Sequence, residues 1–143
     1  MSALKTQCHC GAVTIGLAHA PDYLNDCNCS LCRSRGAMWG YFESKSVQVR
    51  GTTQTYVRAD CDDPAVEIHF CPHCGATTHF TVTESYQRAH GPMDRVGVNM
   101  RLAASENLNG IEVRFPDGWN WDGSKPPGVR HPPMKWEDTF YSG

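Results

Sequence analysis

The chain has 143 residues, which fits a single domain, and a hydrophobic fraction of 40%, which is enough for a real core. Its formal net charge of -2 gives no basic footprint for nucleic acid, and no run approaches the roughly 20 apolar residues of a membrane span. Residues 1–6 lack the apolar region of a secretory signal. We therefore expect a cytoplasmic protein without a nucleic-acid or membrane partner.

Alternating apolar residues predict a series of short strands. The pattern first appears at Val13, Ile15 and Leu17, where apolar residues alternate with smaller or polar ones. Further strands are expected over residues 37–42, 47–49, 55–57, 66–70, 77–83, 95–100 and 111–115. Helix signals are poor, and the best lie at residues 30–35 and 103–108. The sequence therefore predicts a mainly β fold with few short helices.

The chain after Gly118 is rich in proline, glycine and tryptophan. We expect no regular element there. Its three tryptophans, Trp119, Trp121 and Trp136, would bury considerable apolar area, so much of the tail should wrap the core. The predicted organisation is one domain over residues 1–143 with a Pro/Trp-rich C-terminal extension from about residue 119.

Eight cysteines are the main chemical feature, and a reduced cytosolic chain with clustered thiols indicates metal binding. Cys71 and Cys74 form a C-x-x-C pair that can hold one zinc ion, and Gly75 allows the backbone to curl under the metal. Two buried free cysteines are the alternative. The best partner pair is Cys8 and Cys10, because both pairs adjoin predicted strands that would lie side by side. Such a four-thiolate site is structural.

Histidines lie inside both of these pairs. We interpret His9 and His73 as exposed spacers, not ligands.

A second cluster places Cys27, Cys29 and Cys32 within six residues. Three thiolates can hold zinc while the fourth corner is left to water or substrate, the pattern of catalytic zinc. Such a site would be a modest Lewis acid but would hold a substrate thiol well as a thiolate. The chemistry indicated is the formation or cleavage of a carbon–sulfur bond.

The alternative is a closed second site with a fourth protein ligand. Cys61 could supply it, although its acidic turn suits a surface loop better. His69, His79 or His90 could also close the site. The pairing of the clusters could equally be swapped, and spacing alone does not decide it.

The order of these motifs resembles the glutathione-dependent formaldehyde-activating enzyme family, which also includes centromere protein V. The motifs are C-x-C-G at residues 8–11, C-x-C-S-x-C-R at 27–33, F-C-x-x-C-G at 70–75, V-N-x-R at 98–101 and F-P-D-G at 115–118. Two features depart from the family pattern: Asn28 replaces a frequent histidine, and the tail after Gly118 is longer. Both lie where substrate choice could be set.

The resemblance implies a β-tent fold of small twisted antiparallel sheets around zinc. It also implies a structural zinc on Cys8, Cys10, Cys71 and Cys74, and a second zinc on Cys27, Cys29 and Cys32. The second ion, held by three ligands, could be labile. The implied reaction joins formaldehyde to glutathione as S-hydroxymethylglutathione, which is a carbon–sulfur lyase reaction in reverse.

Several side chains are candidates for substrate contacts. Arg33 and Arg35 could pair with a carboxylate of glutathione, and solvated surface arginines are the alternative. Trp39, Tyr41 and Phe42 could line a pocket near the zinc, although core packing is the alternative for at least two of them.

Two polar residues, Asn99 and Arg101, are separated by one position near the end of the strand expected over residues 95–100. Asn99 and Arg101 should share one face of a predicted strand. No catalytic base is indicated.

The sequence therefore supports two functions. The first is a zinc-dependent carbon–sulfur lyase acting on an adduct of a small thiol, such as glutathione with formaldehyde or another aldehyde. The second is a non-enzymatic zinc module that binds a protein partner. The oligomeric state is not indicated.

Overall fold

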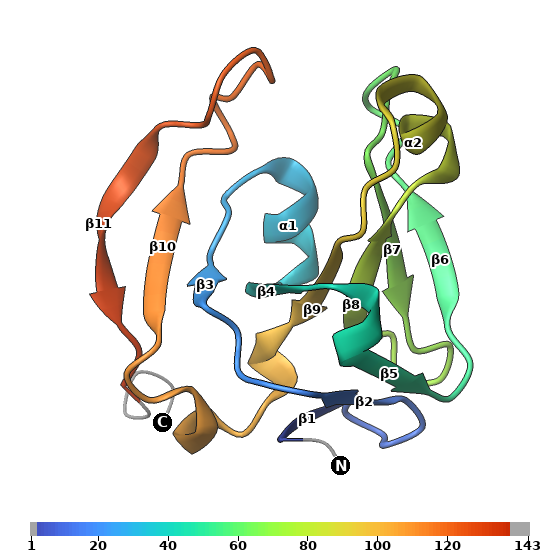
Figure 1. The fold of residues 1–143 in the computed structure, drawn as a ribbon, viewed down its shortest axis with the longest axis vertical. Coiled ribbons are helices and arrows are strands. Elements are labelled where there is room, and N and C mark those ends of the chain that lie inside the picture. Colours follow the sequence, from blue (N-terminus) through green and yellow to red (C-terminus); the bar gives the residue numbers. More distant parts are fainter. Residues whose placement is uncertain (1–2, 138–143) are drawn as a thin grey trace.

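A three-stranded sheet and an eight-stranded sheet form most of the regular structure (Figure 1) in the computed structural model, which describes residues 3–137. The smaller sheet has the order β1-β2-β5, with β1 at Leu4–Gln7, β2 at Thr14–Leu17 and β5 at Val47–Arg50. The larger sheet has the order β11-β10-β3-β4-β9-β8-β7-β6. Its strands are β3 (Tyr23–Asn25), β4 (Trp39–Phe42), β6 (Gln54–Val57), β7 (Val66–Phe70), β8 (Thr77–Val82), β9 (Val96–Asn99), β10 (Glu112–Pro116) and β11 (Val129–Lys135).

The helices are few and short, as predicted. They are α1 (Ser30–Arg35), α2 (Glu84–His90) and the 3-10 turns η1 (Ser44–Ser46), η2 (Met100–Leu102) and η3 (Ser105–Leu108). Across residues 3–137 no helix has the length and apolar character to cross a bilayer. The mainly β class is confirmed, and each strand range expected from the sequence contains a strand.

Some elements were not predicted. The strand β3 has three residues, too few to show a period, and in β1 one of the two buried positions is Thr6, which does not read as apolar. The helix α2 was missed although Thr83 caps it, accepting from the backbone N–H of Tyr86, and Glu84 lies in its first turn. The sheets are also not wholly antiparallel, because β10 pairs with β3 in parallel.

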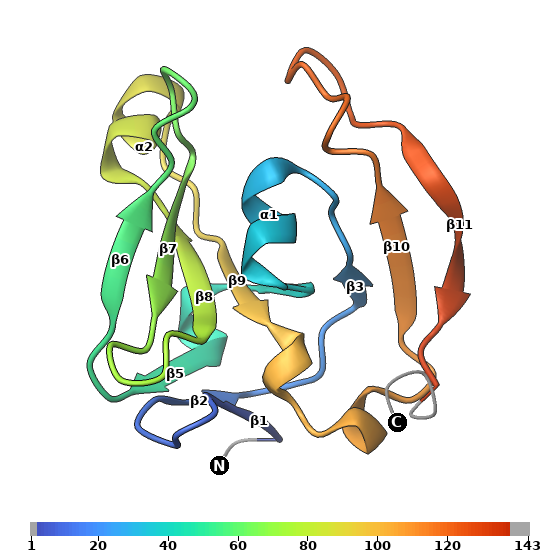
Figure 2. The same cartoon turned by 180° about the vertical axis from the view of Figure 1, so that it is seen from behind.

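The parallel β3–β10 pair brings the β10–β11 hairpin close to α1. Seen from either side, α1 lies between the β10–β11 hairpin and the strands β6, β7 and β8 (Figures 1 and 2). A buried cluster connects α1 to β4, β7 and β8 through Leu31, Trp39, Ile68 and Phe80. The rings of Trp39 and Phe80 meet edge to face at a centroid distance of 4.9 Å. Since this packing fixes α1, it also fixes the cysteines at its beginning.

The tail contradicts the expectation that no regular element follows Gly118. The strand β11 pairs with β10 through residue 135 and includes Pro132 and Pro133. Those prolines are tolerated because β11 is an edge strand and because they fall where its register with β10 shifts, between Met134 and His131. The boundary of the extension near residue 119 stays a prediction, and residues 138–143 lie outside the described part.

Only one of the three tail tryptophans is buried. Trp136 is 4% exposed and donates its ring N–H to the Ser105 carbonyl oxygen at 3.0 Å, whereas Trp119 and Trp121 are 60% and 49% exposed. The expectation that all three pack on the core is therefore wrong for two of them.

Asn99 is a buried junction between strands, not part of a face shared with Arg101. The strand β9 ends at Asn99, so Arg101 falls in the η2 turn. The Asn99 Oδ1 accepts from the backbone N–H groups of Met38 and Arg101, each at 3.2 Å. Its Nδ2 donates to the Thr77 carbonyl oxygen at 2.9 Å. This side chain thus connects β4, β8 and β9.

The replacement Asn99→Ala is expected to lower the free energy of unfolding by roughly 2–4 kcal/mol, because buried backbone groups of Met38 and Thr77 lose their partners. Urea unfolding followed by circular dichroism measures the change. The matched control is Asn107→Ala at an exposed position, where a change within about 0.5 kcal/mol is expected. Equal losses in the two variants would show that the buried amide has no special role.

Candidate metal centres

Four cysteine sulfurs converge where the turn after β1 meets the turn after β7. The ligand atoms of Cys8, Cys10, Cys71 and Cys74 all lie within 4.8 Å of one another. The Sγ of Cys10 is 3.8 Å from that of Cys8 and 3.6 Å from that of Cys71. A tetrahedron with zinc–sulfur bonds of about 2.3 Å has edges of about 3.8 Å. The spacing of this four-cysteine cluster therefore fits one zinc ion.

The two cysteine pairs of this cluster come together in a different way from the one expected. We expected β2 and β7 to lie side by side, but they belong to different sheets. The two turns converge instead, and Val13 and Ala76 pack around the buried Cys8 and Cys71. The pairing of the two cysteine pairs agrees with the prediction even though its reason was wrong.

Backbone N–H groups point at the sulfurs of this cluster. The N–H of Val13 donates to Cys8 Sγ at 3.2 Å, and that of His73 donates to Cys71 Sγ at 3.4 Å. Backbone donation from Ala76, and then from Cys10, lowers the pKa of Cys74 to about 6. Such donors favour thiolates, the form that binds metal. The intervening His9 and His73 are exposed, as predicted.

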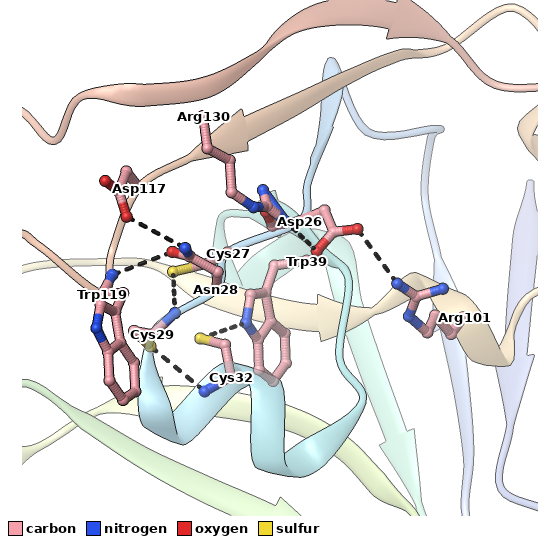
Figure 3. Close-up of polar contacts among 10 residues, drawn as sticks. All are labelled: Asp26, Cys27, Asn28, Cys29, Cys32, Trp39, Arg101, Asp117, Trp119 and Arg130. Atoms are coloured by element: carbon pink, nitrogen blue, oxygen red, sulfur yellow. Dashed lines mark hydrogen bonds and ion pairs between the residues drawn. The ribbon is translucent and has the colours of Figure 1, made fainter.

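A second group, the three-cysteine cluster, lies at the beginning of α1. It consists of Cys27, Cys29 and Cys32, whose sulfurs are within 4.8 Å of one another. Cys29 is the N-cap of α1, and its Sγ accepts from the backbone N–H of Cys32 at 3.3 Å. Cys27 Sγ accepts from the N–H of Cys29 at 3.4 Å, and Cys32 Sγ from the ring N–H of Trp39 at 3.2 Å (Figure 3).

Hydrogen bonds among the three thiols shift their pKa values in opposite directions. Hydrogen bonds from Cys27 and Cys32 lower the pKa of Cys29 to about 2. The pKa values of Cys27 and Cys32 rise, because these thiols keep the protons that they donate. Metal binding at such a cluster releases the thiol protons, because the thiolate is the form that binds metal.

Within residues 3–137, no fourth histidine, cysteine or carboxylate joins the three-cysteine cluster. Cys61 is exposed and belongs to neither cluster. The His69 ring is hydrogen-bonded to Thr53 and Thr81 and stacks on His79 at 4.1 Å, while His90 contacts Asp63. All eight cysteines lie in the described part and are free, so no disulfide joins them.

The three-cysteine cluster opens into a cavity of about 710 Å³. All three of its cysteines line that cavity, together with Trp39, Tyr41 and other side chains from α1, the large sheet and the tail. Among the described residues, the charged ones that line the cavity are Arg58 and Arg95, and no carboxylate or histidine lines it. The size is typical of a site for a small molecule.

The two arginines of the cavity were missed from the sequence because no local pattern distinguishes them. The guanidinium of Arg58 makes a two-point contact with Asp60, with its Nε 2.6 Å from Oδ1. The guanidinium carbon of Arg95 lies 4.0 Å from the centroid of the Tyr41 ring. Arg95 thus brings a positive charge next to the phenol.

The sequence-predicted substrate contacts lie in different places. Trp39 lines the cavity, whereas Arg33 and Arg35 do not. The guanidinium of Arg33 lies 5.0 Å from the Trp119 ring, and that of Arg35 lies 5.0 Å from the Tyr56 ring. Of the three proposed aromatic wall residues, Phe42 packs in the other core cluster. Substrate contact by Arg33, Arg35 and Trp39 stays a prediction.

A segment of the tail covers one side of the cluster. In this cover segment, residues 117–121, Asp117 Oδ1 accepts from Asn28 Nδ2 at 3.1 Å, and the Trp119 N–H donates to Asn28 Oδ1 at 3.0 Å (Figure 3). Gly118 packs so closely that an added Cβ would lie 2.5 Å from Cys27 Sγ. The side chain of Asn28 thus joins the cysteine loop to the tail.

A carboxylate next to the cluster anchors the tail a second time. Asp26 accepts from Arg130 of β11 at 3.0 Å and from Arg101 at 3.4 Å (Figure 3). Asp26 directly precedes Cys27, so β11 is tied to the loop that carries the cysteines.

The matching family model is described as glutathione-dependent formaldehyde-activating enzyme, and it covers residues 3–100. The chain belongs to this family. The matched range contains both cysteine clusters but ends before the cover segment. A crystal structure of a Rhodobacter sphaeroides protein is similar at 30% identity and a TM-score of 0.53, over 69% of this chain and 86% of that one. No curated protein matches the chain.

The replacement Gly118→Ala is expected to displace the cover segment, because the new Cβ would overlap Cys27 Sγ. Overpacking costs about 1–3 kcal/mol, so the rate at which a thiol reagent modifies Cys27 should rise about tenfold. Peptide mass spectrometry of the labelled protein measures that rate. The control is Gly128→Ala, where an added Cβ meets nothing within 4 Å. An unchanged rate in Gly118→Ala would mean that this contact does not hold the segment.

Proposed function

We propose that this chain binds two zinc ions and acts at the second of them as a carbon–sulfur lyase on adducts of a small thiol. Glutathione with formaldehyde is the reference case, in keeping with the family. The observation that carries the proposal is the three-cysteine cluster, whose three sulfurs line a cavity of about 710 Å³. A metal bound there would keep one position for a ligand from that cavity.

The donor sets of both clusters suit zinc. Thiolate sulfur is a preferred zinc ligand, and four thiolates make a closed structural site while three leave a catalytic one. Cys8, Cys10, Cys71 and Cys74 are assigned to the structural ion, and Cys27, Cys29 and Cys32 to the second ion. Free thiols throughout agree with a reducing, cytoplasmic setting.

The proposed reaction needs no oxidant or reductant. In the direction of synthesis a sulfur–carbon bond forms, and the thiol proton ends on the former carbonyl oxygen. In the direction of cleavage that oxygen loses its proton, the carbon–sulfur bond breaks, and the electron pair returns to sulfur. Zinc, when bound, would supply stabilisation of the substrate sulfur as a thiolate.

We assign Tyr41 as the hydrogen-bond and proton donor to the carbonyl oxygen of the aldehyde. It lines the cavity, and its hydroxyl oxygen accepts from Asn25 Nδ2 at 2.8 Å, which leaves the phenol's own hydrogen to donate. Burial raises the pKa of Tyr41 to about 12, so the hydroxyl keeps its proton at neutral pH. The positive charge of Arg95 beside the ring would stabilise negative charge that develops at this oxygen.

The second candidate function is a non-enzymatic zinc module that binds a protein partner. It requires a second site completed by a fourth protein ligand. Cys61 lies on an exposed turn outside both clusters, which supports the enzyme over the module.

Metal content provides the first test. The wild-type chain should contain two zinc ions, Cys29→Ser one, and Cys61→Ser two, because only the first variant removes an assigned ligand. Inductively coupled plasma mass spectrometry of protein purified under reducing conditions measures the ratio. Loss of zinc from the Cys61→Ser variant would favour a closed site and the module.

Activity provides the second test. The replacement Tyr41→Phe is expected to lower kcat about 100-fold with little change in KM, since a proton donor contributes about 10²–10⁴-fold. Exchange NMR of glutathione with formaldehyde, corrected for the spontaneous rate, measures the catalysed exchange. The control is Tyr86→Phe on α2, which should keep the wild-type rate. Full activity in Tyr41→Phe would remove the phenol from the mechanism.

A further inference from the structure

The cavity above the three-cysteine cluster has an aromatic wall formed by the tail. Trp119 and Trp121 both line it, yet they remain 60% and 49% exposed. Exposed aromatic surface that faces a cavity is available for a ligand to cover. Both tryptophans lie outside the family-matched range of residues 3–100.

The wall is held firmly against the cysteines. Asn28 makes two hydrogen bonds to the cover segment, one with Asp117 and one with the backbone of Trp119. Arg33 lies over the Trp119 ring at 5.0 Å, on a helix that begins at the cluster. Because Asn28 lies between two assigned metal ligands, the position of Trp119 is fixed relative to their sulfurs (Figure 3).

The opposite side of the cavity is also apolar. It is lined by Trp39, Val66, Ile68 and Phe80, which continue into the buried cluster beneath α1. A ligand group between the two sides would contact aromatic and aliphatic carbon on both.

A polar hollow adjoins the apolar cavity. It has a volume of about 490 Å³ and is lined by Ser30, Leu31, Ser34, Arg35, Tyr56, Arg58 and Asp60. Ser30, Leu31 and Arg58 line both spaces, so the two are neighbours. A polar thiol such as glutathione has hydrogen-bond partners in the hollow. The apolar cavity is then left for the half of the adduct that derives from the aldehyde.

We propose that the cover segment selects adducts whose aldehyde-derived group is aromatic or of similar apolar bulk, larger than the hydroxymethyl group of formaldehyde. The inference rests on the proposed function. In an adduct the former carbonyl carbon is bonded directly to sulfur, so its substituent must lie beside the cysteines and the walls around them. A phenyl ring there covers the aromatic wall, whereas the hydrogen atoms of formaldehyde leave that wall in water.

The test compares benzaldehyde with formaldehyde as partners of glutathione, using the zinc-loaded full chain. Exchange NMR gives kcat/KM for each adduct, divided by its spontaneous rate. The wild type should favour benzaldehyde by about tenfold or more, and Trp119→Ala should lower this preference about tenfold, as loss of a buried aromatic contact does. Asn28→Ala should lower it as well through release of the segment. Met93→Ala, exposed and outside the cavity, should keep it.

The outcomes separate this inference from the proposed function. Turnover of both adducts with formaldehyde favoured, and no effect of Trp119→Ala, would overturn the inference and leave the lyase in place. If neither adduct is turned over, the proposed function fails, and binding of benzyl mercaptan and of ethanethiol to the same variants decides the inference. Calorimetry should then show a preference for benzyl mercaptan that Trp119→Ala lowers about tenfold. If the wild type and Trp119→Ala show the same preference for benzyl mercaptan over ethanethiol, the inference is overturned.

Discussion

The convergence of three sulfurs at the beginning of α1 is the constraint on which the candidate site depends. Cys27 lies two residues after the end of β3, Cys29 caps the helix, and Cys32 lies in its first turn. That geometry places three soft donors within 4.8 Å while their backbone and indole N–H partners orient them. One short helix and the loop before it thus bring three sulfurs together, and all three cysteines line the cavity.

The surrounding fold holds this helix from two directions. On one side, Leu31 and Trp39 pack against Ile68 and Phe80 of the large sheet. On the other, the parallel pairing of β10 with β3 carries the tail back to the cysteines, where Asp26 and Asn28 bind it. The family-matched part of the chain provides the sulfurs, and the tail provides one wall of the cavity. We therefore infer that binding chemistry and substrate choice reside in different parts of the sequence.

Much of this could be predicted from local pattern. The spacing of Cys71 and Cys74 indicates a metal turn by itself, and the strand ranges follow from alternation because side chains point to opposite faces of a sheet. The helix at Ser30–Arg35 was expected over its full length. The acidic turn around Cys61 correctly indicated an exposed thiol outside the clusters.

The features that were missed depend on contacts between distant residues. Nothing local indicates that Arg58 and Arg95 would line one cavity, or that the turns after β1 and β7 would meet without β2 and β7 pairing. Trp119 is 60% exposed, and its backbone N–H is bonded to Asn28, 91 positions earlier in the chain. Composition predicts that tryptophan packs, but only tertiary structure decides whether it packs on the core or faces a ligand.

X-ray absorption at the zinc edge tests the central claim most directly. The account predicts that the zinc-loaded chain has a mean of about 3.5 sulfur neighbours per ion, from one closed and one open site, and that adding glutathione raises it to about 4. A mean of about 4 before any thiol is added, with no change afterwards, would mean that the chain itself completes both sites and would contradict the account.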